Sequence, residues 1–323
     1  MTAASATMRR TSGMKAWAPA RLFALALLCA GPGLAHAQDA GANSPGSLRA
    51  RYGALQEQLS HNQFQRPLYM DSSETPGGVA GEIYALVNYP FATVGAALKS
   101  PGNWCDILIL HLNTKYCRAS SAGQETLLNV SIGKKYDQPL DKAYRVAFAY
   151  RVAAQTPNYL QVLLNADEGP FSTRNYRIVF EAVPLKKGQT FIHLSYSYGY
   201  GLVGRLAMQV YFGTTGSGKV GFTVTGTQAG GEPLYIGGMR GLVERNTMRY
   251  YLAIEAFLGA LSLPPQAQLE KRLHDWFAAI EHYPRQLHEM DEGAYLEMKR
   301  KEVRRQQAEL PDAGAGRLSA AAQ

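Results

Sequence analysis

The stretch Ala143-Tyr-Arg-Val-Ala-Phe-Ala-Tyr-Arg-Val-Ala153 decides the fold class of this chain. Large apolar side chains occupy every second position from Tyr144 to Val152, with arginine or alanine between them. Because side chains alternate between the two faces of a sheet, this pattern predicts a strand with one apolar and one mixed face. Strands of this kind are typical of antiparallel sheets, whereas the strands of parallel sheets are apolar throughout.

Further strand patterns lie on both sides of this stretch. They are predicted at 82–88, 126–134, 158–165, 175–183, 189–198 and 219–225. After a glycine-rich loop, Leu242–Leu261 carries an apolar stripe with helical spacing. We therefore expect an α+β fold with an antiparallel sheet of about six to seven strands, and the long helix covers its apolar face.

Helical patterns flank this core. Ser44 and Pro45 can cap and begin an N-terminal helix, and Gln63–Gly78 is expected to be a polar connection. Beyond Pro265 an apolar stripe predicts another helix, and a charged helix follows at 286–309. The basic run Lys299–Arg305 is interpreted as an exposed face, and a transient contact with anionic lipid headgroups is the alternative.

The first 37 residues have the form of a secretory signal peptide. Four basic residues and no acidic ones precede an apolar run that begins at Leu22, and the segment ends at Ala35-His-Ala37. Export to the periplasm is therefore expected. No later segment is apolar enough to span a membrane. We expect a small, polar and disordered tail at 311–323.

Composition narrows the possible functions. The net charge is +8, and half of it belongs to the first 37 residues, so the sequence does not predict a nucleic-acid-binding protein. Cys105 and Cys117 remain after signal cleavage, and an even pair in an exported protein suggests a disulfide; two buried thiols are the alternative.

Three short motifs are imperfect matches to enzyme signatures. Gly199–Gly204 spells G-x-G-x-x-G but lacks the acidic partner, and Gly213–Lys219 resembles a P-loop but is followed by valine. Ser131–Lys134 spells S-x-x-K without its partner motifs. The histidines form no metal-binding pattern. The sequence thus predicts no cofactor, no metal and no catalytic residue.

The order of the elements resembles the START-like superfamily, also called the helix-grip, polyketide-cyclase-like or SRPBCC fold. The resemblance covers roughly 76–263 and rests on Gly81–Phe91, Pro101–Trp104, Glu168–Phe171 with Arg174–Arg177, Thr190–Tyr198 and Leu242–Leu261. It implies a curved sheet wrapped on the long helix, with a hydrophobic molecule, often a lipid, bound between them. The expected organisation is a signal peptide (1–37), a linker and N-terminal helix (38–76), a START-like ligand-binding domain (77–263), a helical extension (264–310) and the tail.

Candidate ligand-binding residues come from both elements of this cavity. The aromatic and aliphatic candidates are Tyr84, Trp104, Phe148, Tyr150, Tyr250, Ile254 and Phe257. If the opposite sheet face lines the cavity, polar groups point inward instead, and an Arg–Glu pair could anchor a headgroup. These candidates are Arg145, Arg151, Arg177, Glu181 and His193. The pattern leaves open which face is concave.

Three functional hypotheses follow. The leading one is a periplasmic carrier or sensor of a hydrophobic small molecule, because no reactive residues stand out. The second is an envelope interaction protein whose interior is filled by side chains. The third is a cyclase- or hydrolase-type enzyme, which would need a titratable pair such as Arg–Glu or His193 with Tyr196 inside the pocket.

Overall fold

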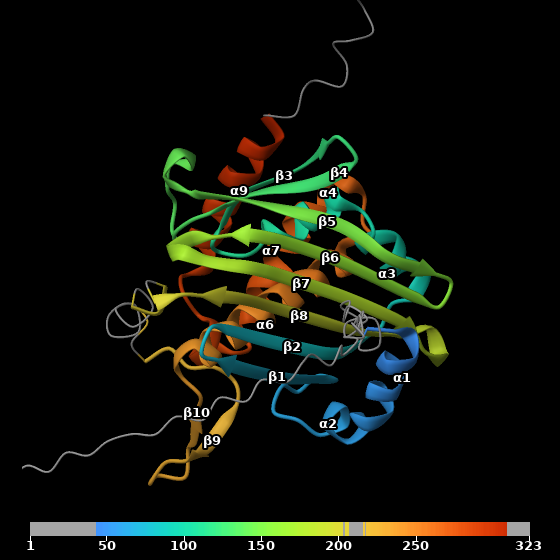
Figure 1. The fold of residues 1–323 in the computed structure, drawn as a ribbon, viewed down its shortest axis with the longest axis vertical. Coiled ribbons are helices and arrows are strands. Elements are labelled where there is room, and N and C mark those ends of the chain that lie inside the picture. The colour runs from blue at the N-terminus through green and yellow to red at the C-terminus, as the bar shows by residue number, and fades with distance from the viewer. Residues whose placement is uncertain (1–42, 203, 207–215, 217, 309–323) are drawn as a thin grey trace, which may run out of the picture. The chain divides into compact units, whose positions relative to one another are not determined.

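The structure is a computed structural model that describes residues 43–202, 204–206, 216 and 218–308 (Figure 1). The signal-peptide segment and the C-terminal tail lie outside the described residues, as does most of the P-loop-like motif. Among the described helices, none is both long and apolar enough to cross a membrane.

The fold is α+β and is built on one large antiparallel sheet (Figure 1). Its strands are β1 (Leu68–Thr75), β2 (Gly78–Val87), β3 (Thr114–Ala122), β4 (Glu125–Ile132), β5 (Tyr144–Thr156), β6 (Tyr159–Glu168), β7 (Thr173–Pro184) and β8 (Thr190–Tyr200). They lie in the order β1-β2-β8-β7-β6-β5-β4-β3. The sheet therefore has eight strands, and the expected six to seven is wrong.

The strands that the sequence did not predict are the two edges of the sheet. β1 lies in the stretch interpreted as a polar connection, and no strand was predicted where β3 lies. In β1 only Leu68, Met70 and Ser72 are buried, and the second half of the strand is exposed. An edge strand with few apolar residues gives a weak period-two signal, so it is identified by pairing rather than by pattern.

The long helix α6 (Gly238–Ala260) packs on the inner face of the sheet, as predicted, and contacts β1, β2 and β8. Gly81 of β2 allows this close approach. A Cβ atom at position 81 would lie 2.5 Å from Oγ1 of Thr247 in α6. The helices α3 (Phe91–Leu98) and α4 (Pro101–Leu108) also bury residues in this core.

The N-terminal helices α1 (Pro45–Ala54) and α2 (Gln56–Ser60) contribute to a second apolar cluster, on the outer face of the sheet. Ser44 caps α1, as predicted: its side chain accepts a hydrogen bond from the Ser47 backbone, and the Ser47 side chain accepts one from the Ser44 backbone. Leu48 of α1 packs in this cluster with Val183 and Phe191 of the sheet. The sheet is thus covered by helices on both faces near β7 and β8.

The C-terminal extension consists of α7 (Pro265–Glu281), α8 (Pro284–Leu287) and α9 (Glu292–Ala308). α7 packs along α6, and α9 packs against β3 and α7. A short hairpin of β9 (Val224–Thr227) and β10 (Pro233–Tyr235) lies apart from the main sheet. The strand predicted at 219–225 therefore overlaps β9 only at its end, and β9 belongs to this separate hairpin and not to the main sheet.

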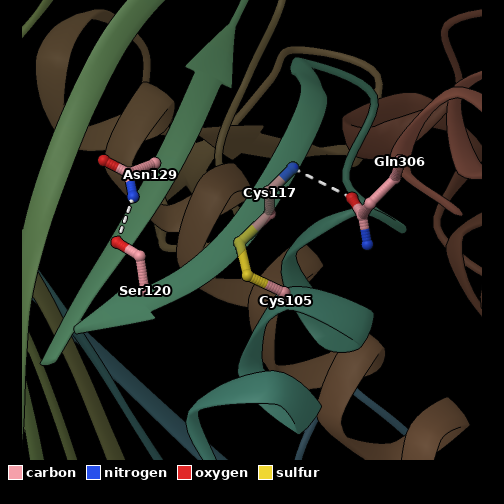
Figure 2. The surroundings of a disulfide bond; sticks show 5 residues. All are labelled: Cys105, Cys117, Ser120, Asn129 and Gln306. Carbon is pink, nitrogen blue, oxygen red and sulfur yellow. Dashed lines mark hydrogen bonds between the residues drawn. A yellow bond between two sulfur atoms is a disulfide. The ribbon is translucent and has the colours of Figure 1, made fainter. Parts of the chain in front are cut away.

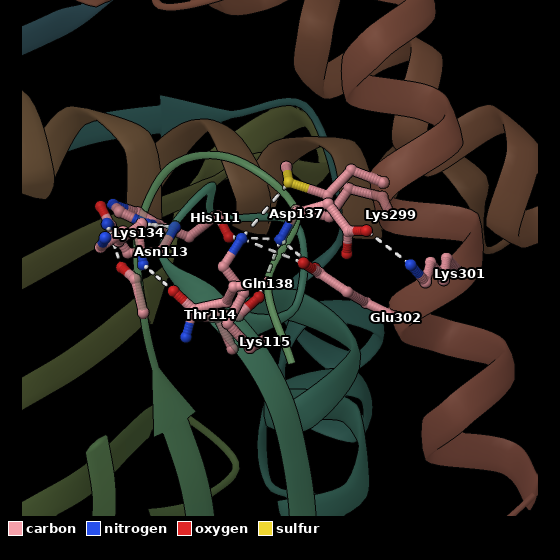
Figure 3. A network of polar contacts seen from close by, with 12 residues as sticks. His111, Asn113, Thr114, Lys115, Lys134, Asp137, Gln138, Lys299, Lys301 and Glu302 are labelled. Carbon is pink, nitrogen blue, oxygen red and sulfur yellow. Dashed lines mark hydrogen bonds and ion pairs between the residues drawn. The ribbon is translucent and has the colours of Figure 1, made fainter. Parts of the chain in front are cut away.

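The interpretation of Lys299–Arg305 as an exposed face is wrong for Lys299, Glu302 and Val303, which are buried. Nζ of Lys299 donates to Oε2 of Glu302 at 2.8 Å and to the backbone oxygens of His111 and Thr114 (Figure 3). Burial lowers the pKa of Lys299 to about 8, although Glu302 opposes the shift. These contacts attach α9 to the start of β3.

The predicted disulfide between Cys105 and Cys117 is present and joins α4 to β3 (Figure 2). Both residues are buried. The backbone N–H of Cys117 also donates to Oε1 of Gln306 in α9 at 2.9 Å. α4, β3 and α9 are therefore connected at one place.

Candidate functional site

Four tyrosines gather where the inner face of the sheet meets α6. This inner tyrosine cluster consists of Tyr176 of β7, Tyr196 and Tyr198 of β8, and Tyr250 of α6. The Tyr176 and Tyr198 rings stack with centroids 5.2 Å apart, and Tyr250 meets Tyr196 edge-on at 5.3 Å. Offset and edge-to-face contacts of this kind are the favoured arrangements of aromatic rings.

Strand register explains why these rings meet. Tyr150 pairs with Leu164, Leu164 with Ile178, and Ile178 with Tyr196, so these four side chains form one row across the inner face. Residues two positions apart in a strand share a face, which places Tyr176 and Tyr198 beside this row. Phe148 extends the cluster by an edge-on contact with Tyr176 at 6.2 Å.

His111 forms the back of this site. Its ring stacks on Tyr250 at 4.9 Å. Nδ1 of His111 accepts a hydrogen bond from the Asn113 backbone, so the neutral ring carries its proton on Nε2. Burial, with added repulsion from Arg249 and Lys299, holds the pKa of His111 well below its ordinary value. The ring is therefore neutral near pH 7.

Two polar atoms at the site have no hydrogen-bond partner among the described residues. They are Nε2 of His111 and the hydroxyl of Tyr150, and both are buried. The Asn246 side chain interacts with His111 and favours its protonated form. Among the described residues, however, no donor or acceptor lies within hydrogen-bond geometry of Nε2. Buried donors normally find partners, so the two atoms mark places where a ligand or water could bond.

Tyr250 and Asn246 indicate that the site is not completely filled. They lie one turn apart on α6, and both keep part of their surface exposed, while Val243, Thr247 and Ile254 are buried. Burial nevertheless raises the pKa of Tyr250, so its surroundings are poor in water. Part of the Tyr250 ring is thus accessible although protein surrounds most of it.

The apolar candidates from the sequence lie in this core with one exception. Phe148, Tyr150 and Tyr250 adjoin the tyrosine cluster, and Ile254 is buried nearby on α6. The two remaining apolar candidates are also packed in the core. Trp104 packs edge-on against Phe180 at 6.0 Å and donates to the Leu98 backbone, and Phe257 lies under the Arg272 guanidinium of α7. The exception, Tyr84, lies on the outer face.

The polar candidates lie on the outer face of the sheet and do not point toward α6. Arg145 and Arg151 are exposed, and Arg177 is half-buried. The apolar residues of β5 are therefore the inner ones, which answers the question of face that the pattern left open. His193 and Tyr196 also lie on opposite faces, so the structure does not bring together the acid–base pair considered for an enzyme.

Glu181 and His193 form a polar cluster on this outer face, in the area covered by α1. Nδ1 of His193 lies 2.8 Å from Oε2 of Glu181, and the hydroxyl of Tyr159 donates to Oε1 of Glu181. The His193 ring stacks on Tyr84 at 4.3 Å, and the Arg51 guanidinium of α1 lies 5.0 Å from the centroid of the Tyr84 ring. This cluster lies beneath a helix and links it to the sheet.

The charges of this outer cluster stabilise one another. Burial disfavours the protonated form of His193, but hydrogen bonds to Glu181 and Glu82 outweigh that effect and raise its pKa. The hydrogen bond with His193 in turn lowers the pKa of Glu82. The His193 ring thus lies between two carboxylates, with Nδ1 2.8 Å from Glu181 and Nε2 3.8 Å from Glu82.

Sequence reasoning did not select His111, Asn246 or Tyr198 as site residues, and it considered Tyr196 only as the partner of His193 in an enzyme. The alternation Ser195-Tyr-Ser-Tyr198 was a usable signal, because it places two tyrosines on one strand face. No local signal marks His111, which lies between α4 and β3 and reaches the site only through the fold.

No protein-family model matches the sequence, and no curated protein matches it. Among solved structures, the chain is similar to a START superfamily protein from Mycobacterium smegmatis, with 12% identity and a TM-score of 0.29 over 45% of this chain and 88% of that chain. It is also similar to norcoclaurine synthase from Thalictrum flavum, with 12% identity and a TM-score of 0.30 over 46% of this chain and 78% of that chain. Human StAR-related lipid transfer protein 5 is similar with 10% identity and a TM-score of 0.28 over 53% of this chain and 91% of that chain. At this degree of similarity the likenesses carry no inference about ligand or activity.

Proposed function

We propose that this protein binds a hydrophobic small molecule, such as a lipid, between α6 and the inner face of the sheet, and that it acts as an exported periplasmic carrier. The observation that supports binding most directly is the partial exposure of Tyr250 and Asn246 inside an otherwise buried, aromatic-rich core. Sites for small molecules are concave and mainly apolar, with a few polar groups that orient the ligand. Aromatic rings with unsatisfied polar atoms beside them fit that description.

Export is proposed from the amino-terminal segment. Its basic start, apolar run and Ala35-His-Ala37 ending are typical of a signal peptide. The disulfide fits an oxidising compartment. Recovery of the protein from the periplasmic fraction with an N-terminus at Gln38 is the expected result, and an uncleaved protein in the cytoplasm would contradict it.

Binding is tested by native mass spectrometry of the protein purified from a bacterial envelope, followed by denaturation. We expect an adduct that denaturation releases and that organic extraction recovers as an apolar molecule. The variant Asn246→Phe should lose the adduct, because the larger ring occupies the space beside Tyr250. The control Asn158→Phe makes the same change at an exposed turn and should keep it.

Protein without an adduct, even after incubation with a total lipid extract, would contradict the binding proposal. So would equal adducts on wild type and Asn246→Phe, because the ligand would then lie elsewhere. In either case the helical extension would become the next surface to test, as an interaction site.

A further inference from the structure

Three cationic side chains contact one carboxylate, Glu289, and a fourth cation lies one helical turn from Arg249. This basic cluster consists of Lys135, Lys219, Arg245 and Arg249. Nζ of Lys135 and Nη2 of Arg249 lie 2.5 and 2.8 Å from Oε1 of Glu289, and Nζ of Lys219 lies 3.3 Å from Oε2. Arg245 precedes Arg249 by one helical turn, and its Nη1 donates to the Val220 backbone at 3.1 Å.

Positive charge exceeds negative charge at this place. Glu244, which neighbours Arg245 in the chain, is bound instead by Ser72 and by the backbone and hydroxyl of Thr223. Among the described residues, Glu289 is the carboxylate that Lys135, Lys219 and Arg249 contact.

The pKa values of Lys135 and Glu289 both respond to the positive charge around them. Burial, followed by repulsion from Arg249, lowers the pKa of Lys135 to about 8, although Glu289 opposes the shift. Burial would raise the pKa of Glu289, but Arg249 and Lys135 outweigh it and hold that pKa below its ordinary value. A site in which a lysine is repelled by its neighbours gains from a further anion.

The basic cluster adjoins the proposed binding site. Arg249 is followed in α6 by Tyr250, and both Arg249 and Lys135 contribute to the lowered pKa of His111. Burial raises the pKa of Tyr198, and Arg245 opposes that rise, so this arginine also lies near the tyrosines. Lys135 and Lys219 each keep about a quarter of their side chains exposed (27%), so a ligand group can reach them.

We propose that the ligand is an anionic amphiphile, with its apolar body against the inner tyrosine cluster and its oxyanion, a carboxylate or a phosphate, at the basic cluster. The inference rests on the proposed function and adds the chemical class of the ligand. Lysine and arginine are the side chains that bind such oxyanions through charge-assisted hydrogen bonds. Without an excess of cations, the same interior would favour a neutral apolar molecule.

The test compares ligands that differ only in charge. Binding of palmitate, hexadecyl phosphate and hexadecanol to the full chain is measured by titration calorimetry at constant ionic strength. We expect each anion to bind at least about tenfold more tightly than the alcohol, the usual effect of a charged hydrogen bond. Inorganic phosphate should compete with hexadecyl phosphate only weakly, because it lacks the apolar body.

Lys135→Gln provides a second readout. We expect this variant to weaken palmitate binding about tenfold and to leave hexadecanol binding unchanged. Lys134→Gln is the matched control: Lys134 is the preceding residue, lies over the ring of Tyr136 and is outside the basic cluster. It should bind both ligands like wild type. The comparison of ligands on wild type remains decisive if Lys135→Gln does not fold.

Equal affinities for the alcohol and the anions would overturn the anionic-ligand proposal while leaving the carrier function in place. The anionic-ligand proposal would be overturned in the same way if inorganic phosphate bound as tightly as hexadecyl phosphate, because the apolar body would then add nothing. If none of the amphiphiles binds, both the ligand class and the proposed function fail.

Discussion

The disulfide between Cys105 and Cys117 gives the prediction that can be worked out most fully. The two residues are 12 positions apart, and a cross-link that closes a loop of this length lowers the entropy of the unfolded chain. The loop-closure relation gives a stabilisation of about 3 kcal/mol at 25 °C. Reduction of the wild-type protein, which leaves both sulfur atoms in the core, should therefore lower the free energy of unfolding by about 3 kcal/mol.

The assay is urea unfolding followed by circular dichroism, with and without a thiol reductant, and alkylation with mass spectrometry to count thiols. We expect the melting temperature to fall by about 5–10 °C on reduction. Cys105→Ala and the double variant with Cys117→Ala should be equally destabilised, and reductant should no longer affect either. The double variant therefore also serves as the control for any effect of the reductant that does not involve the disulfide.

The reasoning would be refuted if reduction exposes two additional thiols but changes the free energy of unfolding by less than about 1 kcal/mol. It would be refuted equally if the protein from the periplasm has both thiols free before reduction. The first result would mean that α4, β3 and α9 hold the loop without the bond. The second would remove one of the supports for export.

Three further predictions follow from buried polar and packed groups. Glu302→Ala leaves Lys115 and Lys299 buried without their carboxylate and should cost about 3–5 kcal/mol in urea unfolding. Arg300→Ala, at an exposed ion pair of the same helix, should change the unfolding free energy far less, and equal losses would contradict the buried role. Gly81→Ala forces a methyl group against Thr247 and should destabilise by about 1–3 kcal/mol, whereas Gly95→Ala, with open space in α3, should be neutral or stabilising by up to about 1 kcal/mol; a neutral Gly81→Ala would show that β2 and α6 are not in close contact. Because the folded-state pKa of His193 is raised, the stability that its protonation contributes is complete below its unfolded pKa of about 6.5 and is lost as the pH rises through the folded pKa. Unfolding free energies of wild type should therefore decline over that range relative to those of His193→Gln, and parallel pH profiles would exclude this linkage.

The local patterns of the sequence predicted much of the core. Period-two alternation located β5 and its neighbours, the helical stripe located α6, and Ser44 with Pro45 marked the start of α1. The pattern failed at the edges of the sheet, because β1 buries few residues and its alternation is faint. It also placed Lys299 in solvent, because a lysine is usually exposed and only contacts with distant residues make its burial tolerable.

The candidate site was predicted only in part, for a related reason. The aromatic members Phe148, Tyr150 and Tyr250 follow from periodicity, but His111 and Asn246 do not. Arg145 and Arg151 were considered as inward-facing because alternation shows that a strand has two faces without showing which one is covered. The sheet register and the position of α6 place these arginines outside.

The sequence by itself predicted the α+β class, the antiparallel sheet and the long helix, and it suggested that the two cysteines pair, since each depends on residues close together in the chain or on a count. Tertiary structure alone decided which sheet face is interior, that His193 lies between Glu181 and Glu82, and that cations from three segments meet at Glu289. The physical reason is that periodicity records the alternation of environments along one segment. The environment itself depends on which other segments fold against it, and these can be distant in the chain, as with Lys135 and Glu289, which are 154 residues apart.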